Sequence, residues 1–553
     1  MAYKRRSGIL AHPTSFDSRF GVGDIGPGAY AFVDFLKKAG QSLWQILPLN
    51  PTGYGDSPYQ SFSTFAGNHL LISPDLLVKE ELLSEEDTRG LPERSPYLAD
   101  YGRAYEVKNR LFKLAFSRFI ADPANTGSQS AFARFCAKNR YWLNDYCLFR
   151  ALKSHFMAER GGADDSENDP LYTEYRLANT HMDKSMIDDC YYGGVWLSWP
   201  KPILERRPAA MSEWRERLGE DILYHKFLQF EFARQWKALR RYARENGVRV
   251  IGDIPIFVAL DSADVWANNS LFLLNKRRQP EAVAGVPPDY FTVTGQLWGN
   301  PLYDWGEHAR TGYKWWRMRI RKTLEFVDIL RIDHFRGFES FWAVPASEKT
   351  AVNGRWMKGP GTEFFNAIKK KLGPLPIIAE DLGFITKAVA KMREDAGFPG
   401  MKITEFGFSG TAENRSLPHF ITDANTVVYT GTHDNDTVIG WYRSVGDRER
   451  DHFRRYMNVD GHDPSWDMIR LVFMSSARIA VVPIQDVYSM GSDCRMNTPG
   501  VTGGNWRFRF PSWILTDDVA ARLRYLSVLS DRNVPAKETE GPPRKRRVRL
   551  VGR

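Results

Sequence analysis

The sequence predicts an α/β protein built on a (β/α)8 barrel, with large helix-rich inserted subdomains and a long lid loop at the C-terminal face of the strands. The first reason is a set of eight short apolar or alternating runs, rich in β-branched residues and bounded by Gly, Pro or Asn. The second is that helix-like stretches separate most of these runs, which is the alternation that a parallel barrel requires. The third is that three carboxylates each stand at the end of such a run.

The eight expected strands are spread along the whole chain. They span residues 7–10, 43–49, 248–256, 327–332, 376–379, 402–406, 426–430 and 479–484. Amphipathic stretches predict helices between most of them, such as residues 29–39 before the second strand and residues 224–245 before the third. Because a helix returns the chain between successive strands, all eight strands are expected to run parallel around one barrel.

The long interval between the second and third runs departs from this alternation. It is helix-rich and aromatic and far longer than one crossover helix requires, so we expect an inserted, mainly helical subdomain at residues 74–225. The barrel is then divided into residues 1–73 and residues 226–533, and the second part includes a lid loop at residues 275–303. The end of the chain, residues 534–553, is predicted to be a disordered basic tail.

The composition is that of a large globular protein. The 553 residues are 43% hydrophobic and 13% aromatic, and no apolar run approaches the ~20 residues of a membrane-spanning helix. The basic start of the chain is not followed by an apolar stretch that would form a signal peptide. The four cysteines include no Cys-x-x-Cys pair, which is typical of reduced thiols. We therefore expect a cytoplasmic protein with no membrane partner.

The formal net charge of +10 raises the question of a nucleic-acid partner. About half of this excess lies in the last twenty residues, and no nucleic-acid-binding motif accompanies it. A short basic tail is typical of a solvated chain end that attracts anionic polymers without specificity. We therefore expect no nucleic-acid partner.

The three carboxylates at the ends of apolar runs are Asp333, Glu380 and Asp434. Strand ends from distant parts of a parallel barrel converge on one face, where the catalytic residues of such barrels lie. A single Asp at a strand end is more often a helix cap, but three in this context favour an active site. Two carboxylates about 5 to 5.5 Å apart are typical of a retaining glycosidase.

The neighbours of these acids suggest a role for each. Arg331 and Asp333 are two residues apart on one strand, so both project from the same face, and the guanidinium can keep Asp333 ionised as a nucleophile. Burial at a strand end would raise the pKa of Glu380, which suits a general acid/base. Asp434, beside His433, would then stabilise the positive charge that develops at the anomeric carbon of a sugar.

Two further segments have the composition of sugar-binding loops. Residues 52–60 combine glycines with two tyrosines and several polar side chains, although an ordinary turn has a similar composition. Residues 284–303 are rich in Gly, Pro and aromatic residues and are too long for a plain connector. Long loops of this kind are usually lids or binding elements.

Several motifs occur in a fixed order along the chain. They include Gly-Asp-Ile-Pro-Ile at 252–256, Arg-Ile-Asp-His-Phe-Arg-Gly at 331–337, Ala-Glu-Asp-Leu-Gly at 379–383 and Thr-His-Asp-Asn at 432–435, together with segments 53–61, 284–303 and 497–506. Over residues 8 to about 510, this set resembles glycoside hydrolase family 77, the 4-α-glucanotransferases of the amylomaltase type.

The resemblance implies a reaction and its participants. Asp333 attacks an α-1,4-glucan donor, a glycosyl-enzyme forms, and the 4-hydroxyl of another glucan or of glucose takes the glycosyl group. No metal and no organic cofactor takes part. By the same matching, Tyr59 would stack in the donor site, and Asp253 and His433 would bind donor sugar beside Arg331. The acceptor side would be lined by Asp289, Phe291, Gln296 and Trp298.

Three function classes remain open from the residues themselves. They are a glucanotransferase, a hydrolase of the same superfamily and a non-catalytic glucan-binding protein. The intact acids argue against the third, and Phe257 and Val258, which stand where an α-amylase usually has Asn-His, favour the transferase. The family resemblance decides between the first two. The sequence predicts neither the preferred chain lengths, nor the formation of cyclic glucans, nor the oligomeric state.

Overall fold

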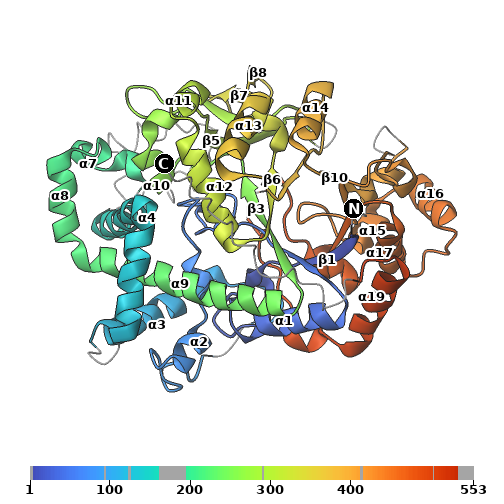
Figure 1. Cartoon of the computed structure of the whole chain (residues 1–553), viewed down its shortest axis with the longest axis horizontal. Coiled ribbons are helices and arrows are strands. Elements are labelled where there is room, and N and C mark those ends of the chain that lie inside the picture. The colour runs from blue at the N-terminus through green and yellow to red at the C-terminus, as the bar shows by residue number, and fades with distance from the viewer. Residues whose placement is uncertain are drawn as a thin grey trace, which may run out of the picture.

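The computed structural model describes residues 4–91, 95–121, 126–160, 195–288, 292–410, 415–501 and 503–533. Eight parallel strands form its central sheet (Figure 1). They are β1 (Arg6–Leu10), β2 (Leu43–Gln45), β3 (Arg249–Pro255), β6 (Ile329–Asp333), β9 (Ile377–Ala379), β10 (Gly400–Ile403), β11 (Thr426–Tyr429) and β12 (Ile479–Pro483).

The strand order around the sheet is β10-β11-β12-β1-β2-β3-β6-β9. In the register, Gly8 of β1 faces Leu43 of β2 on one side and Val481 of β12 on the other. Between the two outermost strands, the N–H of Ala379 in β9 donates a hydrogen bond of 2.9 Å to the carbonyl of Pro399, just before β10. The sheet is therefore closed into a barrel, and the predicted (β/α)8 fold is confirmed.

Two expected strands differ in extent from those in the structure. The second ends at Gln45 rather than at residue 49, and the residues from Thr404 to Phe408 form a 3-10 helix instead of the end of a strand. The apolar side chains of the second run beyond the strand end, such as Leu47 and Leu49, are nevertheless buried. A short buried apolar run does not reveal whether its backbone is extended, because burial alone sets its composition.

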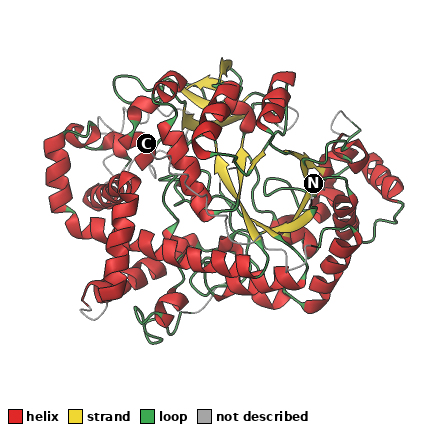
Figure 2. Ribbon diagram, viewed as in Figure 1, coloured by secondary structure: helices red, strands yellow, loops and turns green. Residues whose placement is uncertain are grey.

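Helices surround the barrel, as Figure 2 shows. This layer includes α1 (Pro27–Lys38), α9 (Gly219–Glu245), α12 (Lys314–Phe326), α13 (Gly361–Leu372), α14 (Lys387–Ala396), α15 (Val438–Ser444), α16 (Asp447–Met457), α17 (Pro464–Met474) and α19 (Asp517–Leu529). Helix α1 illustrates the local signals: Pro27 occupies the first turn, Lys37 and Lys38 lie in the last turn, and Phe32 and Leu36 are buried. An amphipathic helix of this kind packs one face on the barrel.

The segment between β2 and β3 is mainly helical. It contains α2 (Pro74–Lys79), α3 (Tyr101–Ala121), α4 (Thr126–Arg160), α7 (Lys201–Leu204) and α8 (Pro208–Arg217), and α3 and α4 pack against α9. These helices lie to one side of the barrel in Figure 1. The boundary expected at residue 225 falls inside α9, which runs unbroken from the insertion onto the barrel.

A buried ion pair joins the insertion to the barrel. Lys108 of α3 has no exposed side-chain surface, and its amine lies 3.0 Å from the carboxylate of Asp24. It also donates to the carbonyls of Leu70 and Ile72, at 2.7 and 3.1 Å. Burial lowers the pKa of Lys108, and the charge of Asp24 opposes this shift. The ammonium therefore fixes α3 to two segments that precede it in the chain.

A small antiparallel sheet contains part of the segment expected to form a lid loop. Within residues 275–303, β4 (Ala282–Val286) and β5 (Gln296–Pro301) form a hairpin, which joins β7 (Ser340–Pro345) and β8 (Arg355–Lys358) in the order β5-β4-β7-β8. Its glycines and prolines made this segment resemble a loop, yet Gly285 is paired inside the sheet, where the carbonyl of Gln296 leaves no room for a Cβ.

Both ends of the described chain meet at the start of β1. The Arg532 guanidinium donates to the carbonyls of Arg6, Phe473 and Ala477, at 3.0, 2.8 and 2.8 Å. This side chain holds the segment after α19 against β1 and against the turn that precedes β12. No helix in the described part of the chain is long and apolar enough to cross a membrane.

Candidate active site

The three predicted acids stand at the carboxyl ends of barrel strands. Asp333 is the last residue of β6, Glu380 follows β9 directly, and Asp434 lies in the loop after β11. These ends share one face because the strands are parallel. A chain of polar contacts connects the three acids across that face.

Arg331 forms the centre of these contacts. Because side chains alternate along β6, Arg331 and Asp333 project from the same face, and the guanidinium lies 3.0 Å from the Asp333 carboxylate. It also pairs with Asp253 on the adjacent strand β3, where the register places the two residues opposite each other. Burial lowers the pKa of Arg331, but the charges of Asp253 and Asp333 outweigh it, so the pKa lies well above its usual value.

Tyr59 connects Asp253 with His433. Its hydroxyl donates a hydrogen bond of 2.6 Å to Asp253 and lies 2.9 Å from Nε2 of His433. Its ring is stacked on the His433 imidazole, with centroids 5.3 Å apart and an interplanar angle of 6°. Burial and the Asp253 charge raise the pKa of Tyr59 well above its usual value, so the phenol stays protonated.

His433 and Asn497 position Asp434. Nε2 of His433 lies 3.3 Å from one carboxylate oxygen of Asp434. The side-chain amide of Asn497 donates a hydrogen bond of 2.5 Å to the other carboxylate oxygen. The Arg495 guanidinium donates a hydrogen bond of 2.5 Å to the backbone carbonyl of Asp434. Burial lowers the pKa of His433, although the charge of Asp434 opposes the shift. The imidazole is therefore neutral near pH 7.

Glu380 is held by backbone donors. The N–H groups of His334 and Leu382 donate to its two oxygens, at 2.7 and 2.8 Å. His334 has a positive φ of 53°, a left-handed backbone conformation directly after the strand end. In the described part of the chain no ion pair reaches Glu380. Burial raises the pKa of Glu380, and the charge of Arg331 and the two backbone hydrogen bonds oppose this shift.

The pKa of Asp333 is also raised. Burial is the main cause, the Arg331 charge lowers the pKa, and the nearby carboxylates of Asp253 and Glu380 raise it further. Several acids share one cation here, so the ionisation of each carboxyl opposes that of its neighbours. The arrangement has the elements of acid/base and nucleophilic chemistry: an acid paired with a guanidinium and a second acid without a cation in contact.

Trp298 approaches the acids from β5. Its indole lies nearly perpendicular to the ring of His334, with centroids 4.9 Å apart and an interplanar angle of 88°. The indole N–H donates a hydrogen bond of 3.1 Å to the side-chain oxygen of Gln296. The side-chain amide of Gln60 donates a hydrogen bond of 3.3 Å to the backbone carbonyl of Trp298. Trp298 and Gln296 therefore lie beside the residue that follows Asp333. Asp289 and Phe291, also expected here, lie outside the described residues.

The sequence did not assign roles to His334, Arg495 or Asn497. Asn497 begins one of the family-like motifs and His334 lies inside another, so motif membership was the only available signal. Their contacts depend on backbone turns between distant segments, which residue types do not reveal. In the described residues, no cluster of three or more His, Cys, Asp or Glu side chains has the geometry to hold a metal ion.

Comparisons with known proteins identify relatives over nearly the whole chain. A family model described as 4-alpha-glucanotransferase, glycoside hydrolase family 77, matches residues 11–516. A 4-alpha-glucanotransferase of Synechocystis is 43% identical over 97% of this chain and 99% of its own, and one of Thermus thermophilus is 43% identical over 96% and 100%. A solved amylomaltase from Streptococcus agalactiae, in complex with acarbose, has a TM-score of 0.86 at 37% identity and covers 96% of this chain and 100% of its own.

Proposed function

This chain belongs to glycoside hydrolase family 77, the 4-alpha-glucanotransferases, and therefore transfers α-1,4-glucan segments; we propose that it does so through a covalent glycosyl-enzyme on Asp333. Donors would be α-1,4-glucans such as maltooligosaccharides, and acceptors would be other glucans or glucose. The observation that carries the proposal is the 3.0 Å contact between Arg331 and Asp333 at the end of one strand. The backbone N–H of the next residue, His334, donates a hydrogen bond to Glu380. Both steps of the proposed reaction use side chains of this chain.

In the first step Glu380 protonates the glycosidic oxygen while Asp333 attacks the anomeric carbon. The bond to the leaving sugar breaks, and an ester to Asp333 forms with inverted configuration. Arg331 contacts Asp333 directly, so we assign the negative charge to Asp333 and the proton to Glu380. Burial raises the pKa of both acids, and that of Asp333 lies well above its usual value, so the Arg331 contact rather than the pKa shifts carries this assignment.

Asp434 is assigned to the sugar that reacts. Its carboxylate is fixed by Asn497 and His433, yet 41% of its side-chain surface is exposed, so it remains accessible to sugar hydroxyls. A fixed negative charge beside the anomeric carbon stabilises the positive charge of the transition state. Tyr59, Asp253, Arg331 and His433 would bind the donor sugar around it.

In the second step the deprotonated Glu380 takes a proton from the 4-hydroxyl of an acceptor glucan. The acceptor oxygen displaces Asp333 from the anomeric carbon, and the second inversion restores the α configuration. Gln296 and Trp298, with Asp289 and Phe291, would hold the acceptor and exclude water. Water in the acceptor position would give hydrolysis, so this side of the site sets the balance between transfer and hydrolysis.

Two measurements test the proposal. Incubation with maltotriose alone should yield glucose and a ladder of longer maltooligosaccharides, whereas glucose and maltose without longer products would mean hydrolysis. Mass spectrometry of peptides from Glu380→Gln, quenched after exposure to α-glucosyl fluoride, should locate a glucosyl group on the peptide that contains Asp333. A glucosyl group on another acid would overturn the assignment of the nucleophile.

We also propose that residues 74–225 form a separate subdomain. A location in the cytoplasm belongs to the same proposal. The absence of a membrane-crossing helix among the described residues is compatible with a cytoplasmic location. Fractionation of the source cells, followed by activity on maltotriose, tests it. Activity in a fraction outside the cytoplasm would contradict it.

A further inference from the structure

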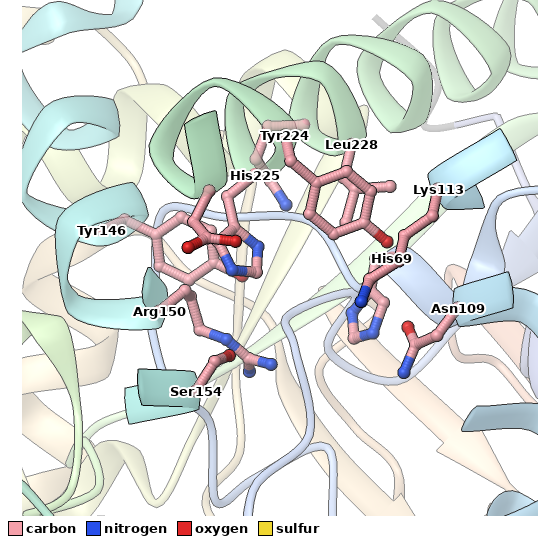
Figure 3. Close-up of a pocket in the computed structure, with 11 residues that line it drawn as sticks. His69, Asn109, Lys113, Tyr146, Arg150, Ser154, Tyr224, His225 and Leu228 are labelled. Atoms are coloured by element: carbon pink, nitrogen blue, oxygen red, sulfur yellow. The ribbon is translucent and has the colours of Figure 1, made fainter. Parts of the chain in front are cut away.

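A cavity of about 200 Å³ lies among the inserted helices, apart from the acids of the active site. Figure 3 shows its lining, which comes from α3, α4, α9 and the 3-10 helix His69–Leu71. The side chains that carry the argument are His69, Lys113, Tyr146, Arg150, Tyr224 and His225. Asn109, Ser154 and Asp221 complete its polar wall.

Arg150 is the central feature of this cavity. Its guanidinium lies over the Phe62 ring, 4.9 Å from the centroid, and its Nε is buried without a hydrogen-bond partner. Among the described residues, no carboxylate pairs with it. Arg150 is only partly buried, so its guanidinium is open to an anionic ligand that would pair with it. Its planar fork matches the oxygens of a phosphate.

The other side chains make the cavity a site for an anion that also carries hydroxyl groups. Lys113 adds a second cation at the rim, while Asp221 is the one carboxylate in the lining. Burial and the Arg150 charge lower the pKa of His69 to about 3 and place that of His225 well below its usual value, so both imidazoles are neutral. The lining therefore has an excess of positive charge at neutral pH.

Neutral hydrogen-bonding groups and tyrosine rings surround this charge. The hydroxyl of Tyr224 is buried without a partner in the described structure, and Tyr146 is 3% exposed with its ring against the cavity. Asn109 and Ser154 stand on opposite sides in Figure 3. Amide and hydroxyl groups beside aromatic rings suit a sugar ring.

The volume limits the size of the ligand. A cavity of ~150 Å³ holds benzene, so about 200 Å³ admits one six-membered ring with its substituents but not a glucan chain. We propose that this cavity binds a phosphorylated monosaccharide, with the phosphate on Arg150 and Lys113 and the sugar hydroxyls on Asn109, Ser154 and Tyr224. This site is separate from the catalytic one and does not depend on the assignments made there.

Isothermal titration of the full-length protein with glucose 6-phosphate, inorganic phosphate and glucose tests the proposal. We expect glucose 6-phosphate to bind at one site, about tenfold or more tighter than either of the other two. Arg150→Gln and Lys113→Gln should each weaken this binding about tenfold, since each removes one charged contact. Arg134→Gln, an exposed position on the same helix α4, should leave it unchanged.

Lys113 is exposed, so its variant tests the site even if Arg150→Gln does not fold. Three results would overturn the proposal: no heat of binding with glucose 6-phosphate at millimolar concentration, binding that survives in Lys113→Gln and a folded Arg150→Gln, or inorganic phosphate that binds as tightly. The last would mean a simple anion site. Binding at the catalytic cleft would persist in the cavity variants and is distinguished in this way.

Discussion

The backbone N–H of His334 donates a hydrogen bond of 2.7 Å to the carboxylate of Glu380. Since His334 directly follows Asp333, one peptide unit sets the spacing between the assigned nucleophile and the assigned acid/base. Two groups that act in turn on one glycosidic bond are thus held by the backbone rather than by flexible side chains.

Asp333→Asn should abolish turnover without unfolding the protein. The amide has nearly the same shape but cannot form the glycosyl ester, and loss of an essential nucleophile commonly costs several orders of magnitude. Maltotriose disproportionation and circular dichroism measure the two outcomes. Activity above about 1% of wild type would remove Asp333 from this role.

Glu380→Gln should affect two donors differently. Glutamine cannot protonate a leaving sugar, so transfer from maltotriose should be lost, while α-glucosyl fluoride, whose leaving group departs unprotonated, should still react in the first step. The comparison is the rate of fluoride release against the rate of glucose release from maltotriose. An equal loss on both donors would indicate that Glu380 is structural.

Trp298→Ala should shift the reaction from transfer toward hydrolysis. Removing the indole costs about 1 kcal/mol of sugar stacking and opens the acceptor side to water. The ratio of reducing ends released to glucose units transferred, taken at equal donor consumption, should rise. Trp356→Ala, which truncates an exposed tryptophan of β8, is a control for aromatic loss on the same small sheet. If the ratio of reducing ends to transferred glucose units is the same in wild type and Trp298→Ala, Trp298 has only a structural role.

Acid should destabilise the protein partly through His12. Burial lowers the pKa of His12 to about 3, whereas a histidine of an unfolded chain titrates near 6.5. Between these values the unfolded chain binds a proton that the folded protein does not. The contribution of neutral, buried His12 to the free energy of unfolding is therefore present above about pH 6.5. Below that pH it is lost, by up to ~1.4 kcal/mol per pH unit.

Urea unfolding at about pH 7.5 and about pH 5.5 measures this effect. His12→Gln should lose less stability between the two pH values than wild type, by about 1 kcal/mol. His462→Gln, at an exposed position, should lose as much as wild type. Indistinguishable losses in all three proteins would show that His12 carries a proton in the folded state.

Lys108→Met should destabilise the protein by ~3 to 5 kcal/mol, because it leaves the buried Asp24 carboxylate without its cation. The double variant Lys108→Met with Asp24→Asn should recover part of this loss, since no unpaired charge remains. Lys113→Met, at an exposed position on the same helix, should change the free energy of unfolding by less than ~0.5 kcal/mol. A Lys108→Met protein as stable as that control would mean that the Lys108–Asp24 contact does not stabilise the fold.

The barrel was predictable because each strand is short, apolar and bounded by turn residues, and because Asp333, Glu380 and Asp434 mark strand ends. The small sheet was not, because β8 has no buried apolar face and β4 contains glycine. Contacts such as Asn497 to Asp434 join segments that residue types alone do not bring together. The roles of the sugar-binding residues stay predictions.

The position of β1 between β2 and β12 has a consequence for biosynthesis. The first strand leaves the ribosome early and pairs with β2, but its other edge finds β12 only after most of the chain has been made. At ~5–20 residues per second, that edge stays open for roughly half a minute or longer. Arg532, which bonds to the start of β1, arrives later still. The nascent chain therefore carries an unpaired strand edge until β12 emerges, and chaperones that cover such edges would matter most for this protein during that interval.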